Sequence, residues 1–121
     1  MKLVRWSALE EGKPQAARAA DVDLVVLRLG GAAHVLHARC PHRGAHLAAA
    51  CLEGRALVCA KHGWDFSVDT GESALVEGER VACFEATVDL AADAVQVDEA
   101  QLAAWARANP PAFHDDELPK L

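Results

Sequence analysis

The amino-acid sequence predicts an all-β fold, an antiparallel β sandwich or barrel, with one short helix near its C-terminal end. Two observations lead to this prediction. Short runs of β-branched and apolar residues recur along most of the chain, and turn-forming Gly, Asp and Pro residues separate them. The chain has 121 residues, which suits one hydrophobic core rather than two. We therefore expect a β domain over residues 1–97, followed by a helix and tail over residues 98–121.

Three strands are expected in the N-terminal third of the chain. Residues 2–6 alternate weakly between polar and apolar side chains, and the turn-like stretch 10–14 follows them. Residues 21–29 form a longer run that is rich in Val and Leu. Gly30 and Gly31 then predict a tight hairpin turn, after which residues 33–38 return as the third strand.

Shorter strands are expected in the rest of the β region. Residues 55–59 and 64–68 have strand character, and Asp69-Thr70-Gly71 closes the second of them with a turn. Residues 81–90 and 94–97 complete the set, with residues 91–93 as a hairpin connection.

One helix is predicted after residue 97. Asp98 has the side chain of a good N-cap, and Gln101 stands at the third position after it. Leu102 and Trp105 share one face of such a helix. Pro110-Pro111 would end it.

Two short Cys/His pairs are the most informative part of the sequence. The pairs are Cys40-Pro41-His42 and Cys59-Ala60-Lys61-His62. Each is short enough for its thiol and its imidazole to bind the same metal ion or cluster. Thiolates favour zinc or iron–sulfur clusters, and neutral imidazole suits either metal.

Zinc is one interpretation of these four side chains, since two Cys and two His can close a tetrahedral structural site. Zinc fingers, however, usually pair Cys with Cys and His with His, and place the histidines on a helix. Here each segment mixes the two residue types, and strand-like sequence surrounds both segments. This arrangement favours an iron–sulfur cluster, with zinc as the alternative.

The stretches CPHRGA and CAKHGWDF together resemble the Rieske 2Fe–2S domain family, in which two His and two Cys hold one cluster. The resemblance implies that Cys40 and Cys59 bind one iron, and that His42 and His62 bind the other iron near the surface. It also implies a Rieske-type sandwich or barrel with a small cluster-binding subdomain. In that context residues 45–51 (AHLAAAC) should be loop and strand, although their alanines favour helix.

The resemblance also predicts a low reduction potential. High-potential members of the family have a disulfide between the ligand segments, but Ala45 and Lys61 stand at those positions here. They also have hydroxyl side chains near the cluster where this chain has Trp64 and Phe66. Fewer hydrogen bonds to the sulfurs stabilise the reduced cluster less. Trp64 and Phe66 are expected to pack beneath the second ligand segment and to shield it from water.

Charge and composition exclude several classes of protein. Residues 1–64 contain nine Lys/Arg and five Asp/Glu, giving +4, whereas residues 65–121 contain three and thirteen, giving −10. No domain-wide basic surface is expected, so nucleic acid is not a predicted partner. Basic residues in or beside the ligand segments (Arg39, Arg43, Arg55 and Lys61) are either ordinary solvated charges or a positive rim that guides an acidic partner.

The location of the protein is inferred from what the sequence lacks. It has no run of about 18 apolar residues and no signal-peptide pattern at its start, so we expect a cytoplasmic protein with no membrane partner. Cys51 and Cys83 are then expected to be free thiols rather than a disulfide. A monomer is favoured.

The predicted function is that of a Rieske-type ferredoxin, a one-electron carrier between a flavin reductase and a terminal oxygenase or another oxidoreductase. The alternative is a Rieske domain or subunit of a larger oxygenase or flavoprotein oxidoreductase. A structural small subunit, like that of nitrite reductases, is disfavoured because such subunits usually lack the ligands.

No catalytic residue is predicted. A mononuclear iron site would need two histidines and a carboxylate. Apart from the proposed ligands the chain has His34, His37, His46 and His114. His34 and His37 come closest to a pair, but their spacing in a strand puts them on opposite faces. The chain is therefore expected to transfer electrons without transforming a substrate.

Overall fold

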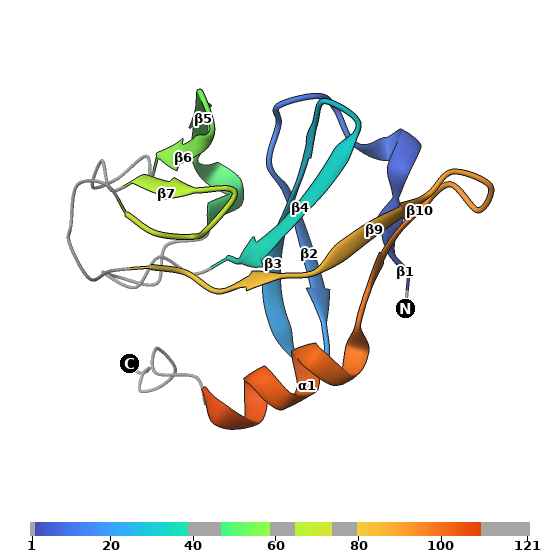
Figure 1. Cartoon of the computed structure of the whole chain (residues 1–121), viewed down its shortest axis with the longest axis vertical. Coiled ribbons are helices and arrows are strands. Elements are labelled where there is room, and N and C mark those ends of the chain that lie inside the picture. Colours follow the sequence, from blue (N-terminus) through green and yellow to red (C-terminus); the bar gives the residue numbers. More distant parts are fainter. Residues whose placement is uncertain (1, 39–46, 59–64, 74–79, 110–121) are drawn as a thin grey trace, which may run out of the picture.

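The computed structural model describes residues 2–38, 47–58, 65–73 and 80–109. In these ranges the chain forms short β-strands, two 3-10 turns and one α-helix (Figure 1). The elements are β1 (Lys2–Arg5), η1 (Trp6–Ala8), β2 (Gln15–Ala19), β3 (Val22–Leu29), β4 (Ala32–His37), η2 (Leu47–Ala49), β5 (Cys51–Glu53), β6 (Ala56–Val58), β7 (Asp65–Ser67), β8 (Cys83–Phe84), β9 (Ala86–Asp89), β10 (Ala94–Val97) and α1 (Glu99–Ala108).

The strands of the described ranges form three antiparallel sheets. Their orders are β1-β10-β9, β2-β3-β4-β8 and β5-β6-β7. In Figure 1 the small β5-β6-β7 sheet lies to one side of the molecule, and α1 lies below the two larger sheets. The predicted all-β class with one short helix is confirmed.

Strand β3 is buried on both of its faces, which explains its nearly continuous apolar sequence. Alternate side chains of a strand point to opposite faces of a sheet. Val25 and Leu27 therefore enter one cluster of buried residues, and Leu24 and Val26 enter another. All four side chains are fully buried.

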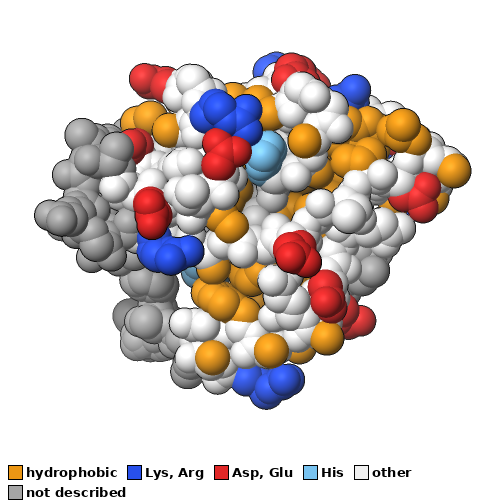
Figure 2. Space-filling view, viewed as in Figure 1, with side chains coloured by type: hydrophobic (Ala, Val, Ile, Leu, Met, Phe, Trp, Pro, Cys, Tyr) orange, Lys and Arg blue, Asp and Glu red, His pale blue; other side chains and the backbone are white. Residues whose placement is uncertain are grey.

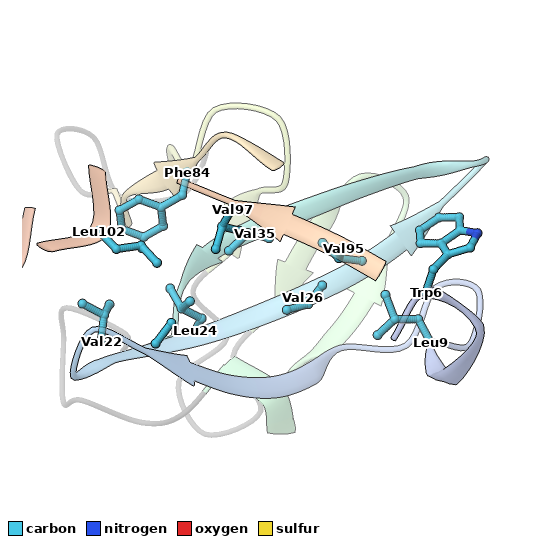
Figure 3. Close-up of a cluster of buried hydrophobic side chains, with 11 residues drawn as sticks. Trp6, Leu9, Val22, Leu24, Val26, Val35, Phe84, Val95, Val97 and Leu102 are labelled. Atoms are coloured by element: carbon cyan, nitrogen blue, oxygen red, sulfur yellow. The ribbon is translucent and has the colours of Figure 1, made fainter. Parts of the chain in front are cut away.

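The buried core of the described residues consists of two clusters. We call the first the loop-side core, and its buried members are Val25, Leu27, Leu36, Ala38, Leu47, Ala50, Leu57, Phe66, Val68 and Val81. We call the second the helix-side core, and its buried members are Trp6, Leu9, Ala19, Val22, Leu24, Val26, Val35, Phe84, Val95, Val97 and Leu102 (Figure 3).

Several predicted elements are confirmed and two are corrected. The 30–31 hairpin connects β3 to β4, and the 91–93 connection joins β9 to β10. Strand β2 was not predicted, because its Ala-rich sequence has weak β propensity; its full-length pairing with β3 holds it in the sheet. Residues 81–90 were expected to be one strand. The chain instead changes sheets there, because β8 pairs with β4 and β9 pairs with β10.

The Ala-rich stretch before β5 behaves largely as predicted. Leu47–Ala49 form a single 3-10 turn instead of an α-helix, and β5 begins at Cys51. Residues 45 and 46 lie outside the described ranges. Leu47 is fully buried in the loop-side core, so tertiary packing rather than helix propensity sets the local structure.

Helix α1 begins where the sequence predicts. The side chain of Asp98 accepts hydrogen bonds from the backbone N–H groups of Ala100, at 2.9 Å, and Gln101, at 3.3 Å. Leu102 is fully buried in the helix-side core. Trp105 packs edge-on against Phe84 with 5.5 Å between ring centroids. The predicted stop at Pro110-Pro111 lies outside the described residues. In the part of the chain that the structure describes, no helix has the length and apolar character needed to cross a bilayer.

Candidate metal centre

The four predicted ligands lie in two segments outside the described residues. Cys40 and His42 belong to residues 39–46, and Cys59 and His62 belong to residues 59–64. The structure describes the strands and turns on both sides of each segment. These flanking residues show where each segment leaves the fold and where it returns.

The first segment begins and ends at one point of the fold. Strand β4 ends at His37, and the carbonyl of the buried Ala38 accepts a hydrogen bond of 2.6 Å from the N–H of Leu47. The N–H of Ala38 donates to the carbonyl of Asp23 at 2.9 Å, which fixes this residue to the start of β3. Residues 39–46 are therefore closed at their base by a backbone hydrogen bond between two buried residues.

The second segment connects two paired strands. Val58 at the end of β6 pairs with Asp65 at the start of β7, and Leu57 pairs with Phe66 one step further from the segment. Leu57 and Phe66 are both fully buried. For Phe66 this confirms the predicted packing role, whereas Trp64 lies outside the described residues. Burying side chains of this size stabilises the fold by about 1.5–3 kcal/mol each.

Both segments start from the same apolar cluster. Ala38 and Leu47 flank the first segment, Leu57 and Phe66 lie one residue inside the base of the second, and all four belong to the loop-side core. The described residues that flank the two Cys/His segments thus belong to one packed unit.

Backbone and side-chain hydrogen bonds also connect the residues after β7 to β7 itself and to Val81. Beyond β7, the N–H of Gly71 donates to the carbonyl of Ser67 at 2.7 Å, and the carbonyl of Gly71 accepts from Val81 at 2.8 Å. The hydroxyl of Ser73 donates to Oδ1 of Asp65 at 3.1 Å, in a partly buried contact beside the second segment. Our sequence reasoning missed the pairing of Asp65 with Ser73. Only the position of Asp65 immediately after HGW could have drawn attention to it.

The charge of Arg55 is neutralised locally, so this residue does not act as a free positive rim. Its guanidinium makes two hydrogen bonds to the carboxylate of Asp69, at 2.8 and 2.7 Å. This hydrogen-bonded pair lowers the pKa of Asp69 and raises the pKa of Arg55. Arg39, Arg43 and Lys61, the other members of the predicted rim, lie outside the described residues. On the face shown in Figure 2, charged side chains of both signs are interspersed.

The two described histidines face opposite sides of the sheet, as predicted. Nε2 of His34 lies 3.4 Å from a terminal nitrogen of Arg55. His37 instead stacks at a tilt on Trp105 of α1, with 4.6 Å between ring centroids. These contacts place the two side chains on opposite faces of the sheet. His46 and His114 lie outside the described residues.

The two cysteines outside the predicted ligand set are free thiols, as expected. Cys51 is exposed on β5, and Cys83 is half-buried against the loop-side core. Burial raises the pKa of the Cys83 thiol, against the weaker opposing influence of Arg80. Within the described ranges no group of three or more His, Cys, Asp and Glu side chains forms a metal site.

The chemistry of the predicted donors fits an iron–sulfur cluster. Two thiolates and two neutral imidazoles supply one soft and one borderline ligand from each segment, which is the set of a His₂Cys₂ cluster. The backbone geometry supports this fit, because the described residues on both sides of the segments belong to the loop-side core.

Comparisons with known proteins agree with this chemistry. A family model described as Rieske [2Fe-2S] domain matches residues 1–85. The oxygenase subunit of tert-butanol monooxygenase / tert-amyl alcohol desaturase from Aquincola tertiaricarbonis is 44% identical over 57 residues. That match covers 46% of this chain and 12% of the oxygenase subunit, so the chain spans only a small part of that relative.

Two solved structures are similar over most of the chain. The ferredoxin of Sphingomonas yanoikuyae B1 has a TM-score of 0.73 and 23% identity, and the match covers 81% of this chain and 96% of the ferredoxin. A chain in the complex of reduced oxygenase and oxidized ferredoxin in carbazole 1,9a-dioxygenase has a TM-score of 0.70 and 26% identity. It is matched over 92% of its length, and 82% of this chain is covered. Since the family model spans well over half of the sequence, the chain belongs to the Rieske [2Fe-2S] domain family, whose cofactor is a 2Fe–2S cluster.

Proposed function

We propose that Cys40, His42, Cys59 and His62 are the four cluster ligands. The support is the donor set together with the described frame, in which both segments are closed at their bases by backbone pairing. In the described part of the chain, no other group of side chains competes for a metal. Cys40 and Cys59 would bind one iron through sulfur, and His42 and His62 the other through nitrogen.

The bound cluster supplies one-electron redox chemistry, and the described residues hold its ligand segments in place. The fully buried Leu57 and Phe66 keep water out of the base of the second segment. The hydrogen bond between Ala38 and Leu47 fixes the base of the first. A frame that moves little between oxidised and reduced states favours fast electron transfer.

We further propose that the chain is a ferredoxin that accepts one electron from a flavin reductase and passes it to a terminal oxygenase or another oxidoreductase. The main support for this proposal is that the structural match covers 96% of the chain of the Sphingomonas yanoikuyae B1 ferredoxin. The similarity to a chain from an oxygenase–ferredoxin complex supports a terminal oxygenase as acceptor. Free thiols at Cys51 and Cys83 agree with action in the reducing cytoplasm. We propose that the chain acts as a monomer.

A low reduction potential is part of the proposal. Phe66 offers no hydroxyl to the cluster, and its side chain is fully buried in the loop-side core. Together with Ala45 and Lys61 in place of bridging cysteines, this supports a potential roughly at the negative end of the Rieske range, near −150 mV. Voltammetry measures it directly, and a value well above zero would contradict the argument.

The ligand assignment is tested by metal analysis of matched variants. The purified protein should be red-brown and contain about two irons and two acid-labile sulfides per chain. Cys40→Ala should lose the cluster, whereas Cys51→Ala, at an exposed free thiol, should keep it. A colourless protein with stoichiometric zinc, or equal cluster loss in both variants, would contradict the assignment.

The carrier role is tested by reconstituting electron transfer. The protein, supplied with NADH and a flavin reductase, should reduce cytochrome c at a rate that depends on its concentration. It should also support product formation by a terminal oxygenase added to the mixture. Failure to accept electrons from any flavin reductase, with the cluster intact, would contradict the role.

A second candidate is a Rieske domain or subunit within a larger oxygenase or flavoprotein. The relative that favours it is the oxygenase subunit from Aquincola tertiaricarbonis, at 44% identity over the matched residues. The two candidates differ in how the chain purifies. Stable co-purification with an oxygenase polypeptide would favour the second.

A further inference from the structure

Helix α1 contacts the end of β4, where the chain leaves the sheet for the first ligand segment. The ring of Trp105 on α1 lies at a tilt on the ring of His37, with 4.6 Å between centroids. His37 is the last residue of β4. The next residue, Ala38, closes the base of the segment, because its carbonyl accepts the N–H of Leu47 at 2.6 Å. Trp105 therefore contacts the direct neighbour of the residue that closes the segment.

The same tryptophan contacts the strand beside β4. Its ring packs edge-on against Phe84 of β8, with 5.5 Å between centroids. The two strands are joined at this point, since the backbone N–H of His37 donates to the carbonyl of Ala82 at 2.8 Å. Strand β8 has two residues, Cys83–Phe84, so its ladder with β4 is short. Trp105 thus bridges both strands of a short ladder beside the base of the first segment.

Other residues of α1 hold the helix on the sheet independently of Trp105. Leu102 is fully buried in the helix-side core. The side-chain oxygen of Gln101 accepts the backbone N–H of Glu85 at 3.3 Å, where the chain changes sheets. Trp105 is half-buried and packs against the edge of that core. The helix can therefore stay in place when the ring at position 105 is removed, and the effect of that removal should be local.

We propose that Trp105 is a positioning residue that holds the base of the first ligand segment closed through its contact with His37, and so slows release of the cluster. The inference rests on the proposed function, in which Cys40 and His42 of that segment bind the two irons. An aromatic pair changes an opening equilibrium roughly two- to tenfold beyond the area that it buries. Loss of both ring contacts of Trp105 therefore predicts a change of about tenfold.

Amide hydrogen exchange of the loaded protein, followed by mass spectrometry, measures opening of the base. The measured quantity is a ratio of two exchange rates. The first is that of a peptide with the N–H groups of His37 and Ala38, and the second is that of a peptide from the middle of β3, which is paired on both sides. Global unfolding exposes both peptides, whereas local opening at the base exposes only the first. The ratio therefore separates local opening from a loss of overall stability.

Trp105→Leu should raise this ratio about tenfold, and should raise the rate of cluster release to an iron chelator to the same degree. Trp105→Phe keeps a ring against His37 and should change both less than threefold. Val95→Ala is the matched control, because it makes a cavity in the same helix-side core, toward Trp6 and away from Phe84 (Figure 3). It should leave the ratio within threefold of the wild-type value. Equal ratios in Trp105→Leu and Val95→Ala, or a raised ratio with unchanged cluster release, would overturn the proposal.

His37→Leu removes the same contact from the other side and leaves Trp105 against Phe84, so it provides the test if Trp105→Leu does not fold. It should also raise the ratio, by at least threefold. Two residues that act through one contact have non-additive effects. The double variant should therefore have about the same ratio as Trp105→Leu alone. An unchanged ratio in His37→Leu, or a double variant in which the two single effects multiply, would overturn the proposal.

The visible spectrum of the wild-type protein distinguishes failure of this inference from failure of the proposed function. A wild-type protein without the spectrum of a His₂Cys₂ cluster would refute the proposed function. A wild-type protein with that spectrum, together with an unchanged exchange ratio in Trp105→Leu, would refute only the role of Trp105.

Discussion

Among the described glycines, Gly71 is the one at which an added methyl group should most destabilise the backbone around the ligand segments. Its φ of +80° lies in the left-handed region. A Cβ built there would lie 2.0 Å from the carbonyl oxygen of Val81 and 3.2 Å from Sγ of Cys83. The first contact is with backbone, which cannot rotate away as a flexible side chain can. Gly71→Ala should therefore push the 81–83 stretch away from the turn after β7.

The cost of Gly71→Ala has three parts. A left-handed φ costs an L-residue about 1–2 kcal/mol. Displacing Val81 weakens the 2.8 Å bond from its N–H to the carbonyl of Gly71, at about 1 kcal/mol net. Crowding against a packed core adds about 1–3 kcal/mol. The free energy of unfolding should fall by roughly 3–6 kcal/mol.

Gly54 provides the matched control. Its φ is +63°, but an added Cβ would meet no atom of the described residues within 4 Å. Gly54→Ala should therefore cost only the conformational part, about 1–2 kcal/mol. At roughly 4 °C per kcal/mol for a chain of this size, the melting temperature should fall by about 12–24 °C in Gly71→Ala and by about 4–8 °C in Gly54→Ala.

Thermal unfolding of the loaded proteins, followed by circular dichroism at one scan rate, measures the difference. Loss of visible absorbance in the same samples reports when the cluster is released. We expect Gly71→Ala to release the cluster at a lower temperature than Gly54→Ala. Equal melting temperatures for the two variants would refute the reasoning, because the contact with Val81 would then contribute nothing.

Three further predictions follow from individual contacts. Asp98→Ala, which removes the N-cap of α1, should lower the free energy of unfolding by about 1 kcal/mol in denaturant titration; an unchanged midpoint would contradict this. The pair with Arg55 lowers the pKa of Asp69. The pair therefore stabilises the folded state at pH values above the ordinary Asp pKa of about 3.9, and this stabilisation is lost as the pH falls through the lowered pKa. Asp69→Asn should therefore flatten the acid limb of a plot of melting temperature against pH, and an unaltered limb would count against the pair. In the loaded protein, where the proposed ligands Cys40 and Cys59 are bound to the cluster, a thiol reagent should modify the exposed Cys51 well before Cys83, whose pKa is raised by burial. Cys51→Ser should remove the fast phase, and its persistence with the cluster intact would show that Cys83 is accessible.

The parts of the fold with local signals were predicted well from the sequence. Strand β3 has an apolar run, the 30–31 turn has two glycines, and α1 has its Asp98 cap. In each case a few neighbouring residues determine the local structure. The proposed ligands were found in the same way, because two short Cys/His motifs need no knowledge of the fold.

Features that depend on distant contacts were missed. Strand β2 forms because it pairs with β3, although its own residues favour helix. The break at Glu85 exists because β8 and β9 pair with strands of different sheets. Similarly, the contacts of Arg55 with Asp69 and of Asp65 with Ser73 join residues 14 and 8 positions apart. No periodicity in the sequence predicts such pairs.

Because the core is divided into two clusters, substitutions in each cluster should affect the protein differently. The loop-side core carries the bases of both ligand segments, whereas the helix-side core carries α1 and the β1-β10-β9 sheet. Strands β3 and β4 contribute to both, so stability is shared between them. A cavity made at Leu102 should therefore weaken the whole fold without moving the bases of the ligand segments. A cavity at Phe66 removes atoms directly beneath the second segment, and should alter the cluster as well as the stability.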